Sequence, residues 1–164
     1  MIFVTVGTHE QPFDRLVSEI DRLKGENAFP DEVIVQTGYC KYQPKFCKCF
    51  KFLDGETMNS YCKQARIIIT HGAPSSIDDA LKLSKVPVVV PRRKRFLEHV
   101  NDHQFEFCHA VKDKKNEIIV VDDVSTLGFI IGNYDSLAKA CNPYTGARVK
   151  QFNEKLIQAV KQLF

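Results

Sequence analysis

The feature that most constrains this chain is a repeated pattern in which short apolar, β-branched runs end on small or polar residues and are followed by segments of helical periodicity. Apolar runs of about 4–8 residues are typical of strands that are buried on both faces of a parallel sheet. We expect such strands at 2–6, 32–38, 66–70, 86–91 and 117–121, with a short additional strand at 50–53.

The segments between these runs predict helices. In the first of them, apolar residues recur at helical spacing from Phe13 to Leu23, and Gly25 can end the helix. We expect further helices at 55–65, 75–84, 100–111, 124–140 and 147–164, and an exposed connection at 39–49. Strands that alternate with helices predict an α/β fold, namely a Rossmann-like parallel sheet with helices on both faces, formed by a single domain over 1–164.

The composition is that of a globular cytosolic protein. Hydrophobic residues make up 44% and charged residues 26% of the 164 residues, and the net charge of +3 is dispersed, so nucleic acid is not an expected partner. The start of the chain lacks the pattern of a secretory signal, so we expect the six cysteines to be reduced. Cys47-x-Cys49 has no second pair at zinc-site spacing, and no metal is expected there.

Ligands of parallel sheets bind beside the carboxyl ends of the strands, so the residues just after each strand are the candidates for a site. Glycine lets a ligand approach the backbone, and the free amides at the start of the next helix favour an anion. Two such turns converge here and predict a diphosphate site, although G-x-G-x-x-G and the P-loop are absent. The alternative is that tight turns need glycine, and a helix needs a Ser75 or Ser76 cap, without any ligand. The candidate residues are Gly7, Thr8, His71, Gly72, Ser75 and Ser76.

Four segments, MIFVTVGTHEQPFDRLV, ITHGAPSSIDDAL, VPVVVPRR and EHVNDHQFEF, resemble the C-terminal, donor-binding domain of family 28 glycosyltransferases. The chain looks most similar to small stand-alone versions of that domain. These are the catalytic subunit of the dolichol-pathway UDP-N-acetylglucosamine transferase and bacterial exopolysaccharide or capsule subunits that work with a separate partner chain. The resemblance implies the C-terminal Rossmann-like half of a GT-B enzyme, which binds a UDP-sugar in the cleft between its halves and uses no metal or other cofactor.

The resemblance also implies roles for residues outside the two turns. Asp79 falls where relatives place an acid on the uridine ribose, although the adjacent Asp78 is a second candidate for that role. The segment from Glu98 to Gln104 implies sugar recognition. The expected sugar contacts are Asp102, His103 and Gln104, with His9, Glu98 and His99 as further candidates.

That segment has a second interpretation, as a metal site. His99 and His103 are spaced i and i+4, which puts both on one face if the segment is helical. Sugar recognition is favoured because the pattern of a zinc protease is absent. No catalytic base is assigned.

We therefore expect a two-subunit inverting hexosyltransferase of exopolysaccharide or capsule biosynthesis. It would transfer galactose or N-acetylglucosamine from a UDP-sugar to a polyprenyl-diphosphate-linked saccharide. Because the first strand begins at Ile2, we expect a membrane-anchored partner to bind the lipid-linked acceptor and to hold this cytoplasmic chain at the inner face of the membrane. The alternative is a non-catalytic accessory subunit that binds nucleotide and stimulates a partner transferase.

Two segments keep open interpretations. The amphipathic segment 147–164 either docks on the partner or packs back on its own sheet. The basic run from Arg92 to Arg95 is expected to be a solvated loop, with contact to the diphosphate or to anionic lipid as the alternative.

Overall fold

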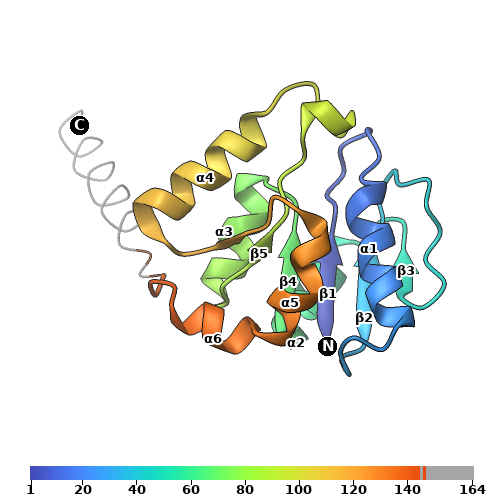
Figure 1. Cartoon of the computed structure of the whole chain (residues 1–164), viewed down its shortest axis with the longest axis horizontal. Coiled ribbons are helices and arrows are strands. Elements are labelled where there is room, and N and C mark those ends of the chain that lie inside the picture. Colours follow the sequence, from blue (N-terminus) through green and yellow to red (C-terminus); the bar gives the residue numbers. More distant parts are fainter. Residues whose placement is uncertain (145, 147–164) are drawn as a thin grey trace, which may run out of the picture.

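The computed structural model describes residues 1–144 and 146, and its centre is one parallel sheet (Figure 1). The strand order is β3-β2-β1-β4-β5-β6, which is the order of a doubly wound Rossmann sheet. The strands are β1 (Ile2–Thr5), β2 (Val33–Gln36), β3 (Lys48–Phe50), β4 (Ile67–Thr70), β5 (Val88–Val89) and β6 (Ile119–Val120). The predicted α/β fold is confirmed.

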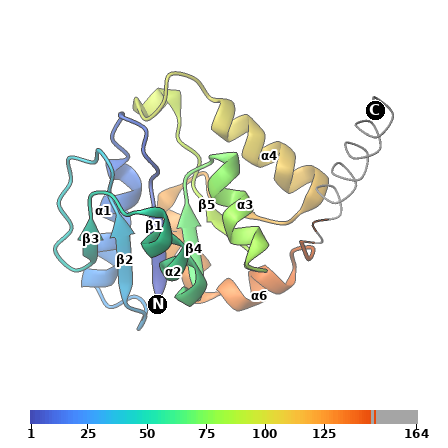
Figure 2. The ribbon, with the colours of Figure 1, turned by 180° about the vertical axis from the view of Figure 1, so that it is seen from behind.

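Helices cover both faces of this sheet. They are α1 (Asp14–Gly25), α2 (Gly55–Gln64), α3 (Pro74–Lys82), α4 (His103–Lys115), α5 (Leu127–Gly132) and α6 (Tyr134–Lys139), with 3-10 turns η1 (Lys94–Phe96) and η2 (Val124–Thr126). Figure 1 shows α1 and α5 in front of the sheet, and the view from behind in Figure 2 shows α2 and α3 on the opposite face. Within the described ranges, no helix is both long and apolar enough to cross a membrane.

The two-sided cover explains why the central strands are apolar over most of their length. Ile67 and Ile69 belong to the core under α1 and α5, whereas Ile68, between them, belongs to the core under α2 and α3. Side chains of a strand alternate between faces, so a strand with helices on both sides needs apolar residues throughout.

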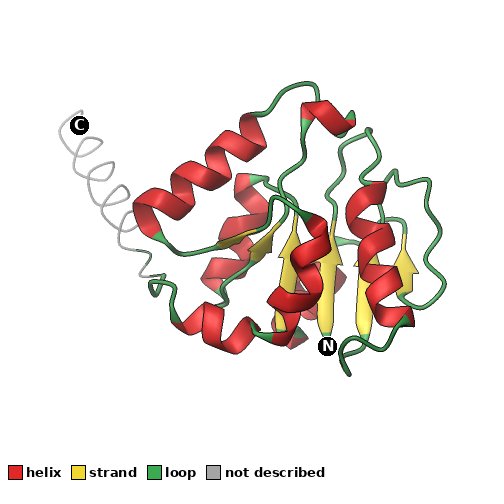
Figure 3. Ribbon diagram, in the orientation of Figure 1, coloured by secondary structure: helices red, strands yellow, loops and turns green. Residues whose placement is uncertain are grey.

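The register of the strands brings their carboxyl ends to one level. Thr5 of β1 is aligned with Gln36 of β2 and with Thr70 of β4, and Thr70 is aligned with Val89 of β5. The strand order reverses between β1 and β4, and this is where ligands bind in such sheets. Figure 3 shows the loops that leave these strand ends gathered along the upper edge of the sheet.

Some predicted boundaries differ from the structure. The short third strand is Lys48–Phe50 rather than 50–53, and the predicted helix at 124–140 is divided into η2, α5 and α6. The division occurs at Asn133, whose side-chain amide donates to the carbonyl of Phe129 and so ends α5. The predicted helix at 147–164 lies outside the described residues.

The connection at 39–49 is not fully exposed, because a buried carboxylate of α1 organises it. Asp21 is 1% exposed and accepts hydrogen bonds from the amides of Lys45, Phe46 and Cys47 and from the hydroxyl of Tyr42. Burial by itself would raise the pKa of Asp21, but these hydrogen bonds hold it below its ordinary value. The sequence pattern gave no signal for this contact, because a single acid on a helix is usually solvated.

Candidate functional site

The turns after β1 and β4 touch each other through a glycine. Gly7 has a left-handed φ of 72°, and a Cβ atom at this position would lie 2.4 Å from Cε1 and Nε2 of His71. The His71 ring therefore packs directly on the backbone of Gly7. The convergence of the two turns, which their sequence positions predict, is present in the structure.

A third strand end joins this contact. Gly38, after β2, has a φ of 55°, and a Cβ atom there would lie 2.8 Å from the carbonyl oxygen of Gly7. The Gln36 side chain donates from Nε2 to the same carbonyl at 3.5 Å. Its Oε1 is buried and has no hydrogen-bond partner within the part of the chain that the structure describes. An unsatisfied buried acceptor beside two glycines is a feature that the sequence pattern did not reveal.

The helix that follows β4 starts with free amides. Ala73 is the N-cap of α3, Pro74 is its first residue, and no side chain caps the helix, so the alternative interpretation, in which Ser75 or Ser76 serves as the cap, is wrong. Proline fits the first helical position because its ring fixes φ and it has no amide proton to leave unpaired. The amides of Ser75 and Ser76 then lie in the first turn, where the helix provides no acceptor for them and the dipole favours an anion.

The second turn also packs closely against α4. A Cβ atom on Gly72 would lie 2.8 Å from Sγ of Cys108 and 2.9 Å from Cβ of Gln104. The side-chain oxygen of Gln104 accepts a hydrogen bond from the amide of Arg92 at 3.4 Å. The packing of Gln104 on Gly72 brings this predicted sugar-binding residue next to the predicted diphosphate turn.

The other predicted sugar contacts lie in different environments. His103 is 80% exposed at the start of α4, whereas Asp102 accepts hydrogen bonds from the amide of Lys94 and from Nε of Arg93. Glu98 is buried and forms a two-point ion pair with Arg15, from Nε to Oε1 at 2.8 Å and from Nη2 to Oε2 at 3.0 Å. Glu98 is therefore engaged in joining α1 to the loop after β5.

The histidines of this region are arranged differently from a helical pair. The helix α4 begins at His103, so His99 lies in the preceding turn, and the shared helical face on which the metal-site alternative depended is absent. Local hydrogen bonds replace the helical ones, since the Asn101 amide donates to Nδ1 of His99 and the His103 amide donates to the Asn101 side chain. His99 stacks on His9 from the loop after β1, with ring centroids 4.7 Å apart. The described residues contain no group of three or more metal-ligating side chains.

Arg92 corrects the expectation of a solvated basic loop. It is 0% exposed, and it donates to the carbonyls of Val6 at 2.8 Å, Gln11 at 2.7 Å and Glu98 at 3.0 Å. Arg92 therefore ties the loop after β1 to the loop after β5. Burial lowers its pKa from the ordinary value, and the guanidinium also lies 4.8 Å from the centroid of the Phe13 ring.

The two adjacent acids of α3 have different surroundings. Asp78 pairs with Lys82 and accepts a hydrogen bond from the hydroxyl of Tyr144. Asp79 is exposed and lines a hollow of about 400 Å³ between α2 and α3. Asp79 follows Ser75 by four residues, so the two lie on the same face of the helix.

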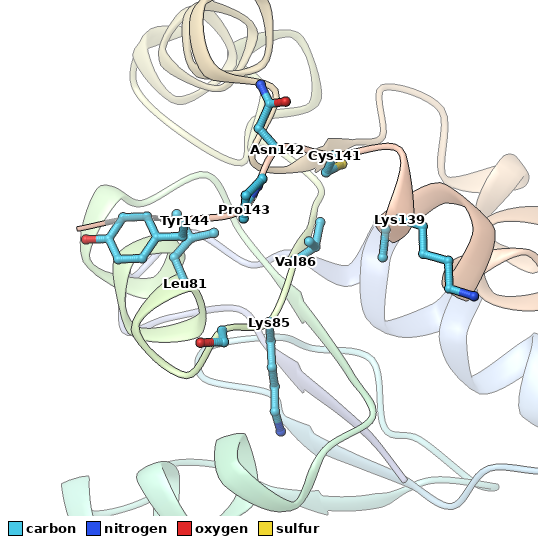
Figure 4. Close-up of a pocket in the computed structure, with 10 residues that line it drawn as sticks. Leu81, Lys85, Val86, Lys139, Cys141, Asn142, Pro143 and Tyr144 are labelled. Atoms are coloured by element: carbon cyan, nitrogen blue, oxygen red, sulfur yellow. The ribbon is translucent and has the colours of Figure 1, made fainter. Parts of the chain in front are cut away.

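A second hollow lies away from these residues. It measures about 250 Å³ and is formed by the end of α3, the loop before β5, the end of α6 and the segment around Pro143 (Figure 4). Val86 in its wall precedes β5, which places the hollow at the amino edge of the sheet. Ligands of doubly wound sheets bind at the other edge, so this hollow is not the candidate site.

His71 is expected to make the stability of the protein depend on pH. Burial, and secondarily the charge of Arg92, lower the pKa of His71 to about 4. In the unfolded chain His71 is protonated below about pH 6.5, whereas in the folded chain it is protonated only below about pH 4. The free energy of unfolding therefore decreases as the pH falls through this interval. The slope contributed by one such group is at most about 1.4 kcal/mol per pH unit.

Urea denaturation across this interval measures the effect. His71→Gln is expected to flatten the slope, and His103→Gln, at an exposed histidine, is expected to leave it unchanged. Burial also lowers the pKa of His99, which therefore leaves a residual slope in the His71 variant. Equal slopes in the His71 variant and the unaltered chain would contradict the assignment.

The sequence model of the glycosyltransferase family 28 C-terminal domain matches residues 1–162. The chain belongs to this family. The comparison with curated proteins gave no match. Family membership supports a glycosyltransferase donor-binding domain.

Proposed function

We propose that this family 28 domain is the donor-binding subunit of a two-subunit inverting glycosyltransferase. In this proposal it transfers galactose or N-acetylglucosamine from a UDP-sugar to a polyprenyl-diphosphate-linked saccharide in exopolysaccharide or capsule biosynthesis. The observation that carries the proposal is the direct contact of the Gly7 and His71 turns at the point where the strand order reverses.

The diphosphate is assigned to this point. Gly7 has no side chain and lets the diphosphate approach the backbone, the free amides of Ser75 and Ser76 offer hydrogen-bond donors, and the α3 dipole adds a positive potential. The same donors would stabilise the charge that develops on the departing UDP, so no metal is required in the proposal. Thr8 is exposed beside the turn and is assigned a contact with the phosphates.

The sugar and the ribose are assigned to the two sides of this diphosphate. Gln104 packs against Gly72, and His103 lies exposed at the start of α4, which suits them to contact sugar hydroxyls. Asp102 is assigned a supporting role because Arg93 and Lys94 occupy its carboxylate. Asp79 is assigned to the ribose, because Asp78 is engaged with Lys82 and Tyr144.

The acceptor is assigned to a separate membrane-anchored subunit. The matched family domain is one half of the GT-B arrangement, and the cleft needs a second half to present the lipid-linked saccharide. The base that takes the proton of the acceptor hydroxyl is assigned to that subunit.

Substituting each of the two aspartates by asparagine distinguishes their roles. Asp79→Asn is expected to weaken the binding of UDP-sugar about tenfold, because charge-assisted hydrogen bonds to the ribose hydroxyls would be lost. Asp78→Asn is the matched control and is expected to retain the affinity. Titration calorimetry measures both dissociation constants, and a larger loss in the Asp78 variant would reverse the assignment.

Thermal stabilisation by a panel of UDP-sugars tests the donor class. A ligand that binds only the folded chain raises the melting temperature, and UDP-galactose or UDP-N-acetylglucosamine is expected to do so whereas ADP-sugars are not. Transfer to a lipid-linked acceptor is then measured with and without the partner subunit. Donor binding without a gain in transfer on reconstitution would favour the accessory role over the catalytic one.

A further inference from the structure

The loop between β5 and α4 carries an exposed apolar surface that the donor site does not use. Phe96 is 44% exposed, Leu97 77% and Val100 64%, and we call these three residues the apolar tip. In Figures 1 and 2, η1 stands above the sheet beside the loop that follows β1. The apolar tip is therefore at the carboxyl edge, where an exposed apolar group suggests contact with another surface.

The backbone holds the apolar tip outward. Leu97 has a left-handed φ of 59°, which a residue with a branched side chain rarely adopts. The amide of Leu97 donates to the carbonyl of Lys94, and the amide of Glu98 donates to the carbonyl of Arg93. Arg15 of α1 anchors the loop through its ion pair with Glu98. The exposure of Leu97 is thus built into an anchored turn.

Uncompensated positive charge lies beside the apolar tip. Arg93 is engaged by Asp102 and lies 3.6 Å from the centroid of the Phe105 ring, while Glu98 is occupied by Arg15. Both acids of this loop, Glu98 and Asp102, are therefore already paired with arginines. Lys94 and Arg95 remain exposed, and the guanidinium of Arg95 lies 4.6 Å from the centroid of the Phe96 ring.

We propose that this loop seats the carboxyl edge of the sheet on a membrane surface that contains anionic lipid. Apolar side chains that enter the boundary between headgroups and acyl chains, flanked by basic residues, are a typical interfacial anchor. Three apolar side chains are a small surface compared with the roughly 800 Å² per partner of a stable protein interface. The charge and the size of the surface both favour lipid as its occupant.

This inference goes beyond the proposed function, in which the partner subunit supplies the attachment to the membrane. It concerns the isolated chain and requires neither a donor nor an acceptor. A failure of vesicle binding would therefore leave the donor proposal intact, and a failure of donor binding would leave this one intact.

Sedimentation with vesicles tests the charges. The unaltered chain is expected to bind vesicles of phosphatidylcholine mixed with phosphatidylglycerol, to release them at high salt, and not to bind phosphatidylcholine alone. Lys94→Gln with Arg95→Gln is expected to weaken binding about fivefold for each charge. Lys63→Gln with Lys139→Gln removes the same charge at the amino edge and is expected to bind like the unaltered chain.

Leu97→Asn tests the apolar contact without straining the fold. Asparagine tolerates the left-handed backbone of this position, so the variant is expected to melt like the unaltered chain while vesicle binding falls severalfold. Phe129→Ser is the matched control, because Phe129 is 69% exposed on α5, away from the loop. Equal binding by the Leu97 variant and the unaltered chain would overturn the proposal.

A fluorescent probe locates the contact within the chain. The chain contains no tryptophan, so Phe96→Trp introduces a single emission that reports the apolar tip. This emission is expected to shift to shorter wavelength with anionic vesicles, whereas that of Phe129→Trp is expected to stay unchanged. Unshifted emission at position 96 on vesicle-bound protein, or no binding at all, would overturn the proposal and assign the apolar tip to a protein partner.

Discussion

Arg92→Met is expected to lower the free energy of unfolding by about 3 kcal/mol, because three backbone carbonyls lose a charged donor together. The guanidinium of Arg92 donates to Val6, Gln11 and Glu98, and no other arginine of the described chain is fully buried. Methionine nearly fills the volume of the removed side chain, so the loss reports the hydrogen bonds more than a cavity. The desolvation cost of a buried charge is regained in the variant, which keeps the expected loss below the sum of three separate bonds.

Urea denaturation measures this loss. Arg95→Met is the matched control, because Arg95 is the same residue type in the same loop but exposed, and its effect is expected to stay within about 0.5 kcal/mol. Arg92→Lys keeps the charge and loses the planar fork, so it is expected to lie between the two. Equal stability of the Arg92 and Arg95 methionine variants would show that Arg92 does not brace the edge of the sheet.

Gly7→Ala is expected to lower the free energy of unfolding by about 2–3 kcal/mol, because the left-handed backbone and the His71 ring both exclude a methyl group. The added Cβ would lie 2.4 Å from two ring atoms of His71. The ring itself is buried, and its Nδ1 lies 3.4 Å from the hydroxyl of Thr70, so it has little room to withdraw. Under the proposed function, the same change is also expected to weaken UDP binding about tenfold or more, since a displaced turn no longer fits the diphosphate.

Gly132→Ala is the control for this substitution. No atom lies within 4 Å of a Cβ at this position, and Gly132 is the last residue of α5 with an ordinary φ. Alanine favours a helix over glycine, so a gain of up to about 1 kcal/mol is expected there. Thermal and urea unfolding of both variants give the comparison. A Gly7 variant as stable as the Gly132 variant would mean that the two strand-end turns are not in obligatory contact.

The convergence of the two strand-end turns could be predicted from the sequence for a simple reason. Strand ends are local features, since an apolar run must stop where the chain leaves the sheet, and all carboxyl ends of a parallel sheet lie on one edge. The turns of Gly7 and Gly72 could therefore be placed together from their positions alone, and in the structure Gly7 packs against His71, the residue before Gly72. The free amides at the start of α3 were predicted for the same reason, and the alternative in which Ser75 or Ser76 caps the helix was wrong.

The segment after β5 was harder to interpret because its contacts are distant in the sequence. Arg92 bonds to Val6, which is 86 positions away, and Glu98 bonds to Arg15, which is 83 positions away. A run of basic residues gives no sign of which member will be buried. The local pattern also placed the start of α4 too early, because the side-chain hydrogen bonds of Asn101 and His99 compete with the helix.

The sequence by itself determined the order of strands and helices along the chain, the two-sided burial of the sheet and the edge at which two glycine turns converge. These follow from periodicity and from glycine positions, which act within a few residues. Only the tertiary structure decided that Arg92 is a buried brace, that Glu98 is engaged with α1, and that Phe96 and Leu97 stand exposed. Those outcomes depend on which carbonyls, acids and rings come into contact at the edge of the sheet. These groups are far apart in the sequence, so their contacts form only when the chain has folded.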